Sequence, residues 1–184
     1  EPYEGRVFDA GCGSGGMFVQ SERYVEAHAD HFKQKNNGLP LNLRDRISIH
    51  GQESNQTTWR LCKMNLAIRS IDASNIKWNN EGSFLKDAHP DLKADFILAN
   101  PPFNVDGVDA EKVRTDPRLP FGLPGVNKKE AVSNGNYLWI SYFYSYLNNN
   151  GRSGFVMSSQ ASSAGGKEKE VRQKSLIYSE EISI

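Results

Sequence analysis

The chain has 184 residues, of which 38% are hydrophobic and 24% are charged. This balance excludes an intrinsically disordered protein, and the length is enough for one domain with a hydrophobic core. Lys plus Arg and Asp plus Glu number 22 each, so the formal net charge is zero. Because a protein that grips nucleic acid unaided usually carries a basic excess, any binding to DNA or RNA is expected to depend on local patches or on a partner.

The sequence shows no sign of a membrane protein or a secreted protein. We find no apolar stretch long enough to cross a bilayer and recognise no signal peptide. The two cysteines, Cys12 and Cys62, lie far apart and form no CxxC motif, which is typical of reduced intracellular proteins. We therefore expect a cytoplasmic protein without a disulfide framework. Because strand-like patterns lie at both ends, we also expect the chain to be a fragment of a longer protein.

Strand-like and helix-like patterns alternate along the chain. Short apolar runs predict strands, and apolar residues three and four apart predict helices. The predicted strands are residues 6–9, 46–51, 75–78, 95–99, 154–157 and 181–184. One predicted helix follows residue 16, and the others span residues 55–70, 136–147 and 167–177. This alternation indicates an α/β fold with a mostly parallel sheet and helices on both faces.

Three segments of this pattern have unusual composition. The helix predicted over 55–70 carries two apolar rows, which are Trp59, Cys62 and Leu66 and, beside them, Leu61, Met64 and Ile68. The helix predicted over 136–147 is rich in aromatic residues, which we expect to pack against the sheet. Residues 104–135 are rich in Gly, Pro, Asp and Asn and show no periodicity. An irregular segment of this length is usually functional or disordered.

A glycine-rich stretch follows the first predicted strand. Gly11, Gly13 and Gly16 satisfy the GxGxxG pattern, in which glycines let the backbone turn tightly and approach a ligand. The pattern alone also fits an ordinary strand-to-helix turn. Glu53, at the end of the second strand, lies much further along than the ~20 residues expected in a dinucleotide site. This spacing argues against a nicotinamide cofactor, whereas a carboxylate there can accept the ribose hydroxyls of any adenosine-containing cofactor.

The segment Asn100–Phe103, with the sequence Asn-Pro-Pro-Phe, follows the strand predicted over 95–99. Each proline has a fixed φ and no N–H to donate, and the residue before a proline favours extended geometry. The result is a rigid corner that presents an amide, backbone carbonyls and an aromatic ring. These groups can hold a flat molecule with an exocyclic amino group. Because ligands bind at the carboxyl ends of parallel strands, we expect the corner, the glycine loop, Glu53 and Phe84 along one edge of the sheet.

Together these motifs resemble those of amino-group methyltransferases that use S-adenosylmethionine (SAM). More closely, the chain resembles the modification subunits of type I restriction–modification systems, which are adenine-N6 DNA methyltransferases. The resemblance rests on residues 13–21, 51–55 and 99–104 and covers nearly the whole chain. It implies a Rossmann-like SAM-dependent methyltransferase fold, truncated at both ends, with residues 1–184 forming part of the catalytic domain.

The resemblance also implies a role for each motif residue. The catalytic corner would consist of Asn100, Pro101, Pro102 and Phe103. In it, the Asn100 amide and the Pro101 carbonyl would accept from the target amino group, and Phe103 would stack on a flipped-out adenine. The residues that would bind SAM are Asp9, Gly11, Gly13, Ser14, Gly15, Gly16, Glu53, Ser83 and Phe84. No metal is expected.

The partners that the resemblance implies are double-stranded DNA, a separate specificity subunit and a restriction subunit. The segment 104–135 is expected to close over the DNA or the flipped base. Its basic residues are Lys112, Arg114, Arg118, Lys128 and Lys129. Two alternatives remain open at this point. One is a SAM-dependent N-methyltransferase that acts on protein glutamine or RNA, and the other is a catalytically inactive SAM-binding subunit.

Overall fold

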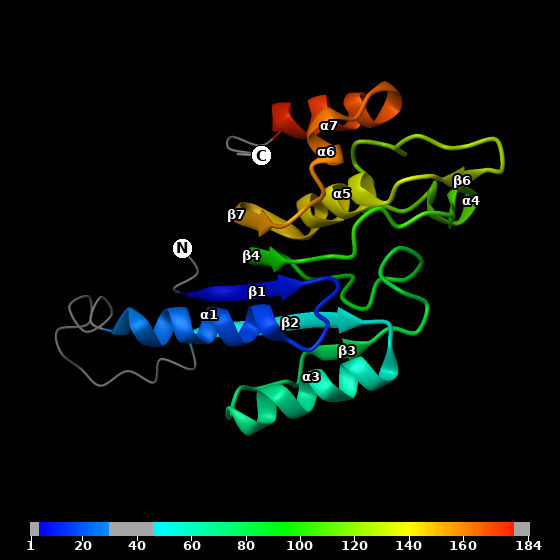
Figure 1. Cartoon of the computed structure of the whole chain (residues 1–184). Coiled ribbons are helices and arrows are strands. Elements are labelled where there is room, and N and C mark those ends of the chain that lie inside the picture. The colour runs from blue at the N-terminus through cyan, green and yellow to red at the C-terminus, as the bar shows by residue number, and fades with distance from the viewer. Residues whose placement is uncertain (1–3, 30–45, 179–184) are drawn as a thin grey trace.

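A five-stranded parallel sheet forms the centre of the computed structural model, which describes residues 4–29 and 46–178 (Figure 1). In spatial order the strands are β3 (Ile76–Trp78), β2 (Ile47–Glu53), β1 (Gly5–Asp9), β4 (Ala94–Ala99) and β7 (Leu147–Phe155). Every pair of neighbours in this sheet is parallel. The parallel sheet predicted from the alternation of strands and helices is therefore confirmed.

Helices cover both faces of the sheet. α1 (Gly16–Ala27) and α3 (Gln56–Ile68) pack on one face, and α5 (Asn136–Tyr146) packs on the other. Successive side chains of a strand point to opposite faces. Accordingly, Val7 of β1 belongs to the core beneath α1 and α3, whereas its neighbour Phe8 belongs to the core beneath α5.

Two helices follow β7 on the α5 side of the molecule. They are α6 (Gln160–Ser163) and α7 (Gly166–Tyr178), and α7 matches the predicted charged helix. It packs against α5 through a small cluster that includes Val171 and Tyr137. The strand predicted over 181–184 lies outside the described residues. Among the helices that the structure describes, none is both long and apolar enough to cross a lipid bilayer.

The segment 104–135 contains regular structure that its sequence pattern does not reveal. β5 (Val108–Asp109) pairs antiparallel with β6 (Ala131–Val132), and α4 (Ala110–Val113) begins where β5 ends. The Asp109 side chain caps α4 by accepting from the first backbone N–H groups of that helix. These elements contribute buried side chains to the core beneath α5. Elements of two to four residues are too short for hydrophobic periodicity to indicate them.

The fifth strand of the sheet begins earlier than predicted. The prediction places it at 154–157, whereas β7 begins at Leu147, opposite Ala94 of β4. The register then shifts, because Phe96 pairs with Arg152, so one residue of β4 and four residues of β7 lie between the two pairings. In this irregular stretch Asn148 donates a hydrogen bond to the Asp95 carboxylate at 2.5 Å. Residues 148–151, with the polar sequence Asn-Asn-Asn-Gly, therefore belong to the strand, although their composition is typical of the end of a helix.

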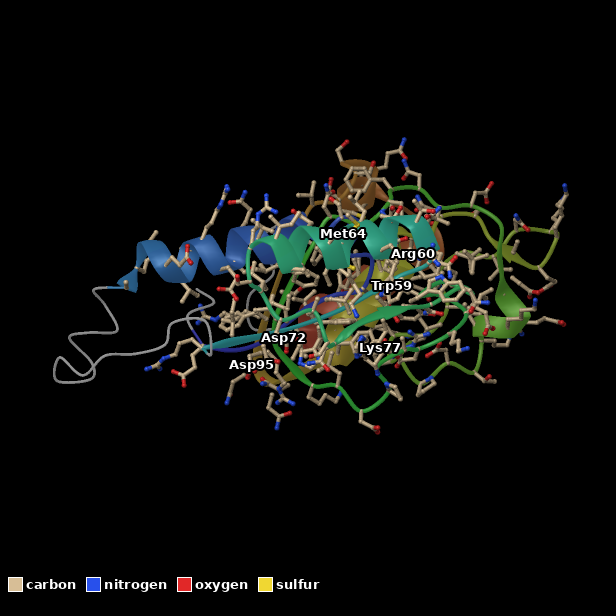
Figure 2. All side chains as sticks on the ribbon, turned by 90° about the horizontal axis from the view of Figure 1, so that it is seen from below. Trp59, Arg60, Met64, Asp72, Lys77 and Asp95 are labelled. Carbon is tan, nitrogen blue, oxygen red and sulfur yellow. The ribbon has the colours of Figure 1, made fainter. Side chains whose placement is uncertain are left out.

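The two apolar rows predicted on α3 have different environments. Cys62 and Leu66 are completely buried against the sheet. Leu61, Met64 and Ile68 are 53%, 61% and 78% exposed. Figure 2 looks onto this side of the molecule and labels Met64 on α3. The helix thus buries one stripe, as an amphipathic surface helix does, although its outer face is also apolar.

We predict that Leu66→Ala lowers the free energy of unfolding by about 2–5 kcal/mol, because it leaves a cavity beneath α3. Leu61→Ala on the same helix is the control, and we expect it to stay within about 0.5 kcal/mol of wild type because Leu61 is half exposed. Urea denaturation followed by circular dichroism measures both values. Equal losses in the two variants would contradict the burial assigned to Leu66.

Candidate active site

The candidate site lies where β1 and β4 end side by side. After β1 the chain runs outward through β2 and β3, and it then returns to β4 on the other side of β1 (Figure 1). In open parallel sheets, ligands bind at the carboxyl ends of the strands near such a change of direction. The glycine loop, residues 10–16, follows β1, and the segment Asn100–Phe103 follows β4. The fold therefore brings the two motifs to one edge of the sheet.

Glu53, at the end of β2, fastens the glycine loop. The backbone N–H of Gly13 donates to Glu53 Oε2 at 3.1 Å. The other carboxylate oxygen accepts from the backbone N–H of Asn55, the residue that caps α3, at 2.8 Å. Glu53 therefore joins the loop to the start of α3. A carboxylate has lone pairs beyond these two bonds, so Glu53 can still accept hydroxyl groups of a ligand.

α3 also contacts the glycine loop directly. Asn65 donates from Nδ2 to the Ser14 carbonyl at 2.8 Å. Gly15 has a φ of +81°, and a Cβ added to it would lie 2.8 Å from Cys62 Sγ. Both the backbone conformation and the close approach of α3 therefore require glycine at this position.

Asp9 ends β1 directly before the glycine loop and is 2% exposed. Its Oδ1 accepts from the backbone N–H of Gly11 at 3.0 Å. Burial raises the pKa of the Asp9 carboxyl to about 7; the hydrogen bond from Gly11 opposes this rise and the charge of Glu53 adds to it. The carboxyl therefore changes its charge near neutral pH.

Cys12, within the loop, packs beside Cys62 of α3, and both thiols are free and buried. The hydrogen bond to Cys62, together with burial, raises the pKa of the Cys12 thiol far above its usual range. Because the thiolate is the reactive form of cysteine, Cys12 is unsuited to act as a nucleophile. The two cysteines are distant in sequence but adjacent in the fold.

The segment Asn100–Phe103 is held from behind by α5. Trp139 donates from Nε1 to the Pro102 carbonyl at 3.2 Å. Asn136 donates from Nδ2 to Asn104 Oδ1 and accepts from the Asn104 backbone N–H, both at 2.9 Å. The residues at both ends of the segment are exposed. The corner is therefore rigid on its inner side and accessible on its outer side.

A cavity of about 390 Å³ separates the glycine loop from the corner. The predicted site residues that line it are Gly11, Glu53, Ser83, Phe84 and Pro102. The predicted residues in the adjoining loop and corner that do not line it are Asp9, Gly13, Ser14, Gly15, Gly16, Asn100, Pro101 and Phe103. The volume lies within the range of roughly 300–1,000 Å³ typical of small-molecule sites.

The cavity also has walls that the sequence analysis missed. Trp139 packs against Phe84 with the ring centroids 4.4 Å apart, and both rings line the cavity. Residues 105–109 and Glu81 form further parts of the wall. In the sequence, Trp139 is one of several aromatic residues in a helix, so its pattern predicts core packing alone. The signals for residues 105–109 are that they follow the proline corner almost directly and belong to the irregular segment 104–135.

The lining of the cavity fits a nucleoside. Phe84 and Pro102 offer apolar walls to a flat base, and Glu53 offers acceptors for ribose hydroxyls. A Cβ added at Gly13 or Gly16 would meet nothing within 4 Å, so no other residue crowds the loop backbone at these two positions. The arrangement can hold an adenosine-containing cofactor next to a second flat molecule at the corner.

The basic residues of the segment 104–135 have different environments. Arg118 is buried and forms an ion pair with Asp116 at 2.6 Å, so it is not one of the solvated basic residues of the segment. Lys112 and Arg114 are exposed. Residues 105–109 of this segment line the cavity. Closure of the segment over a base stays a prediction.

We predict that Asp9 makes the folded state less stable as the pH rises. Its pKa is about 7 in the fold against an ordinary 3.8, so its stabilising contribution is complete below about pH 4 and is lost as the pH rises through 7. Asp9→Asn keeps an acceptor for Gly11 but cannot ionise. Its melting temperature should therefore fall less between pH 5 and pH 8 than that of wild type. Differential scanning fluorimetry checks this, and parallel profiles would contradict it.

The model of the N-6 DNA methylase family matches residues 1–183 of the chain. The methylase subunit of the type I restriction enzyme HindI from Haemophilus influenzae is 39% identical over 182 residues. The matched region is 96% of this chain and 37% of the relative, so the chain spans little more than a third of that curated protein.

Solved structures share the fold. The methyltransferase subunit of a type I restriction-modification system from Streptococcus thermophilus superposes with a TM-score of 0.71 at 22% identity, over 94% of this chain and 33% of that one. A Listeria monocytogenes protein described as a class I S-adenosylmethionine-dependent methyltransferase gives a TM-score of 0.61 at 12% identity, over 95% and 45%. The predicted Rossmann-like methyltransferase fold is thus confirmed. With a family model matched over nearly its whole length, the chain belongs to the N-6 DNA methylase family.

Proposed function

We propose that the chain is part of the catalytic domain of an adenine-N6 DNA methyltransferase that uses SAM, within the modification subunit of a type I restriction–modification complex. The observation that carries this proposal is that Gly11 of the glycine loop and Pro102 of the corner line one cavity. A methyl donor held by the loop would therefore lie beside an acceptor held at the corner, as direct transfer requires. Membership of the N-6 DNA methylase family supports adenine in DNA as the acceptor.

The chemistry of the cavity supports SAM as the cofactor. Glu53 would accept the ribose hydroxyls, and Ser83, Phe84 and Pro102 would enclose the adenine. The glycine loop, with Asp9 behind it, would take the methionine part. When bound, SAM supplies a methyl group made electrophilic by its sulfonium. Burial raises the pKa of Asp9 to about 7 in the protein alone. The positive charge of SAM, bound in this loop, would favour the ionised form of Asp9.

The corner would activate the target nitrogen. The exocyclic amine of adenine is a weak nucleophile because its lone pair is conjugated with the ring. The Asn100 side-chain carbonyl and the Pro101 main-chain carbonyl would accept hydrogen bonds from its two N–H groups, which shifts electron density onto the nitrogen as it attacks the methyl group. The prolines keep the corner in one conformation, so these dipoles need no rearrangement during the reaction.

The target adenine must leave the duplex to reach the corner, which costs a few kcal/mol. Phe103, which is 42% exposed, would stack on the extruded base, and such stacking is worth about 1–3 kcal/mol. The zero net charge of the chain supports the choice of target by a separate specificity subunit. A restriction subunit would complete the complex, and with DNA as its substrate it would act in the cytoplasm.

Transfer of labelled methyl groups from SAM, by the full-length protein with its partner subunits, tests the proposal. We expect the label on the N6 atom of adenine in double-stranded DNA, identified by nucleoside analysis. Label on protein glutamine or on RNA, with none on DNA, would contradict the proposal in favour of another amino-group methyltransferase. SAM binding without any transfer would contradict it in favour of an inactive SAM-binding subunit.

We predict that Asn100→Ala lowers kcat by about 10²-fold or more, because it removes a carbonyl aimed at the reacting nitrogen. Its dissociation constant for SAM should stay within about twofold of wild type, since Asn100 does not line the cavity. Calorimetric titration and single-turnover kinetics measure the two quantities. Asn149→Ala, an exposed position on β7, is the matched control. Parallel loss of SAM binding and transfer in Asn100→Ala would rule out the assigned role.

A further inference from the structure

The cavity wall formed by Ser83 and Phe84 has no regular secondary structure. Its main-chain carbonyls are held by side chains from distant segments. The Ser83 carbonyl accepts from Arg118 Nη1 at 2.9 Å, and the Phe84 carbonyl accepts from the Tyr142 hydroxyl at 3.0 Å. The Ser83 hydroxyl in turn donates to the carbonyl of Ala10, where the glycine loop begins. The wall is therefore held by Arg118 and Tyr142 on its inner side and by a hydrogen bond to the glycine loop.

All three guanidinium nitrogens of Arg118 donate hydrogen bonds to neighbouring groups. Nε and Nη2 donate to the Asp116 carboxylate at 3.0 and 2.6 Å, and Nη1 also donates to the Tyr146 hydroxyl at 3.2 Å. The guanidinium carbon lies 4.1 Å from the centroid of the Tyr142 ring. A planar fork of donors can make these contacts together, whereas the single ammonium of lysine cannot.

The groups around Arg118 also bind one another. The Tyr142 hydroxyl lies 3.4 Å from Asp116 Oδ2, and the Tyr146 hydroxyl donates to Asp87 Oδ1 at 2.5 Å. Burial acts to raise the pKa of Asp116, but the hydrogen bonds and charge of Arg118 outweigh it and lower that pKa. The pair is therefore charged at neutral pH, and removing one partner would leave the other charge buried and unpaired. Substitutions that test Arg118 or its neighbours must therefore keep the charge or the shape of the side chain that they replace.

From this geometry we propose that Arg118, together with Tyr142, is a positioning residue for cofactor binding. Neither Arg118 nor Asp116 lines the cavity. Arg118 acts through the carbonyl of Ser83 and Tyr142 acts through that of Phe84, and together they hold the wall that encloses the adenine of the cofactor. The identity of the ligand as SAM rests on the proposed function.

Arg118→Lys in the full-length protein tests the inference, because it keeps the positive charge but loses the fork. We expect the dissociation constant for SAM to rise about tenfold, as for the loss of one hydrogen bond to a charged group, and the KM for SAM to rise with it. At saturating SAM, kcat should stay within about twofold, because the corner is untouched. Calorimetric titration without DNA gives the affinity, and steady-state kinetics with DNA give the split between KM and kcat.

Arg114→Lys is the matched control, since Arg114 belongs to the same segment but pairs with Glu130 at the surface at 3.2 Å. We expect it to bind SAM as wild type does. Tyr142→Phe is the second variant: it keeps the ring beneath Arg118 but removes the hydroxyl that holds the Phe84 carbonyl, and it should also weaken SAM binding. Melting temperatures are recorded, and each titration is made where the variant is fully folded.

Unchanged SAM affinity in folded Arg118→Lys would overturn the inference, and so would a fall in kcat with an unchanged KM. If Arg118→Lys does not fold, Tyr142→Phe decides alone: a raised dissociation constant supports the inference and an unchanged one overturns it. Wild-type protein that binds SAM but methylates no DNA would refute the proposed function, while the affinity comparison would still decide the role of Arg118. Wild-type protein that binds no SAM would refute both.

Discussion

The parallel pairing of β1 with β4 is the constraint on which the candidate site depends. Val7 pairs with Phe96 and Phe8 with Ile97, so the two strands end at the same edge of the sheet. The glycine loop and the proline corner, which are distant in sequence, thereby border one cavity. A register slip of one residue would turn Phe8 from the core beneath α5 toward the opposite face. The packing of helices on both faces therefore protects the alignment of the site.

α5 connects that alignment to the rest of the molecule. Its aromatic side chains fill the core on one face of the sheet, while Asn136 and Trp139 hold the corner and Tyr142 and Tyr146 reach the buried Arg118. Polar groups buried in this way would be destabilising without partners. Here Trp139, Tyr142 and Arg118 each donate to a main-chain carbonyl of the cavity wall, and Asn136 and Tyr146 pair with the side chains of Asn104 and Asp87. The same hydrogen bonds thus stabilise the core and hold the site in shape.

Where the structure departs from the sequence pattern, the cause is the environment that the fold gives each residue. β7 begins earlier than predicted because Leu147 pairs with Ala94 and the polar residue Asn148 donates a hydrogen bond to Asp95 of β4. The outer apolar row of α3 faces away from the sheet, since a helix buries one stripe only. By sequence Arg118 is one of several basic residues in an irregular segment, yet it is buried beside α5 and paired with Asp116, two residues away. A charge pattern does not reveal whether a basic residue is solvated or paired.

Local chemistry alone accounts for the order of the elements, the glycine loop and the proline corner. Hydrophobic periodicity specifies strands and helices, glycine permits the φ of +81° at position 15, and proline restricts the backbone at positions 101 and 102. Tertiary packing settled which side chains complete the site. Trp139 and Arg118 carry no distinguishing pattern, because their roles arise only when α5 and the segment 104–135 close against the end of the sheet. Such contacts depend on the arrangement of whole elements, which short-range sequence patterns do not specify.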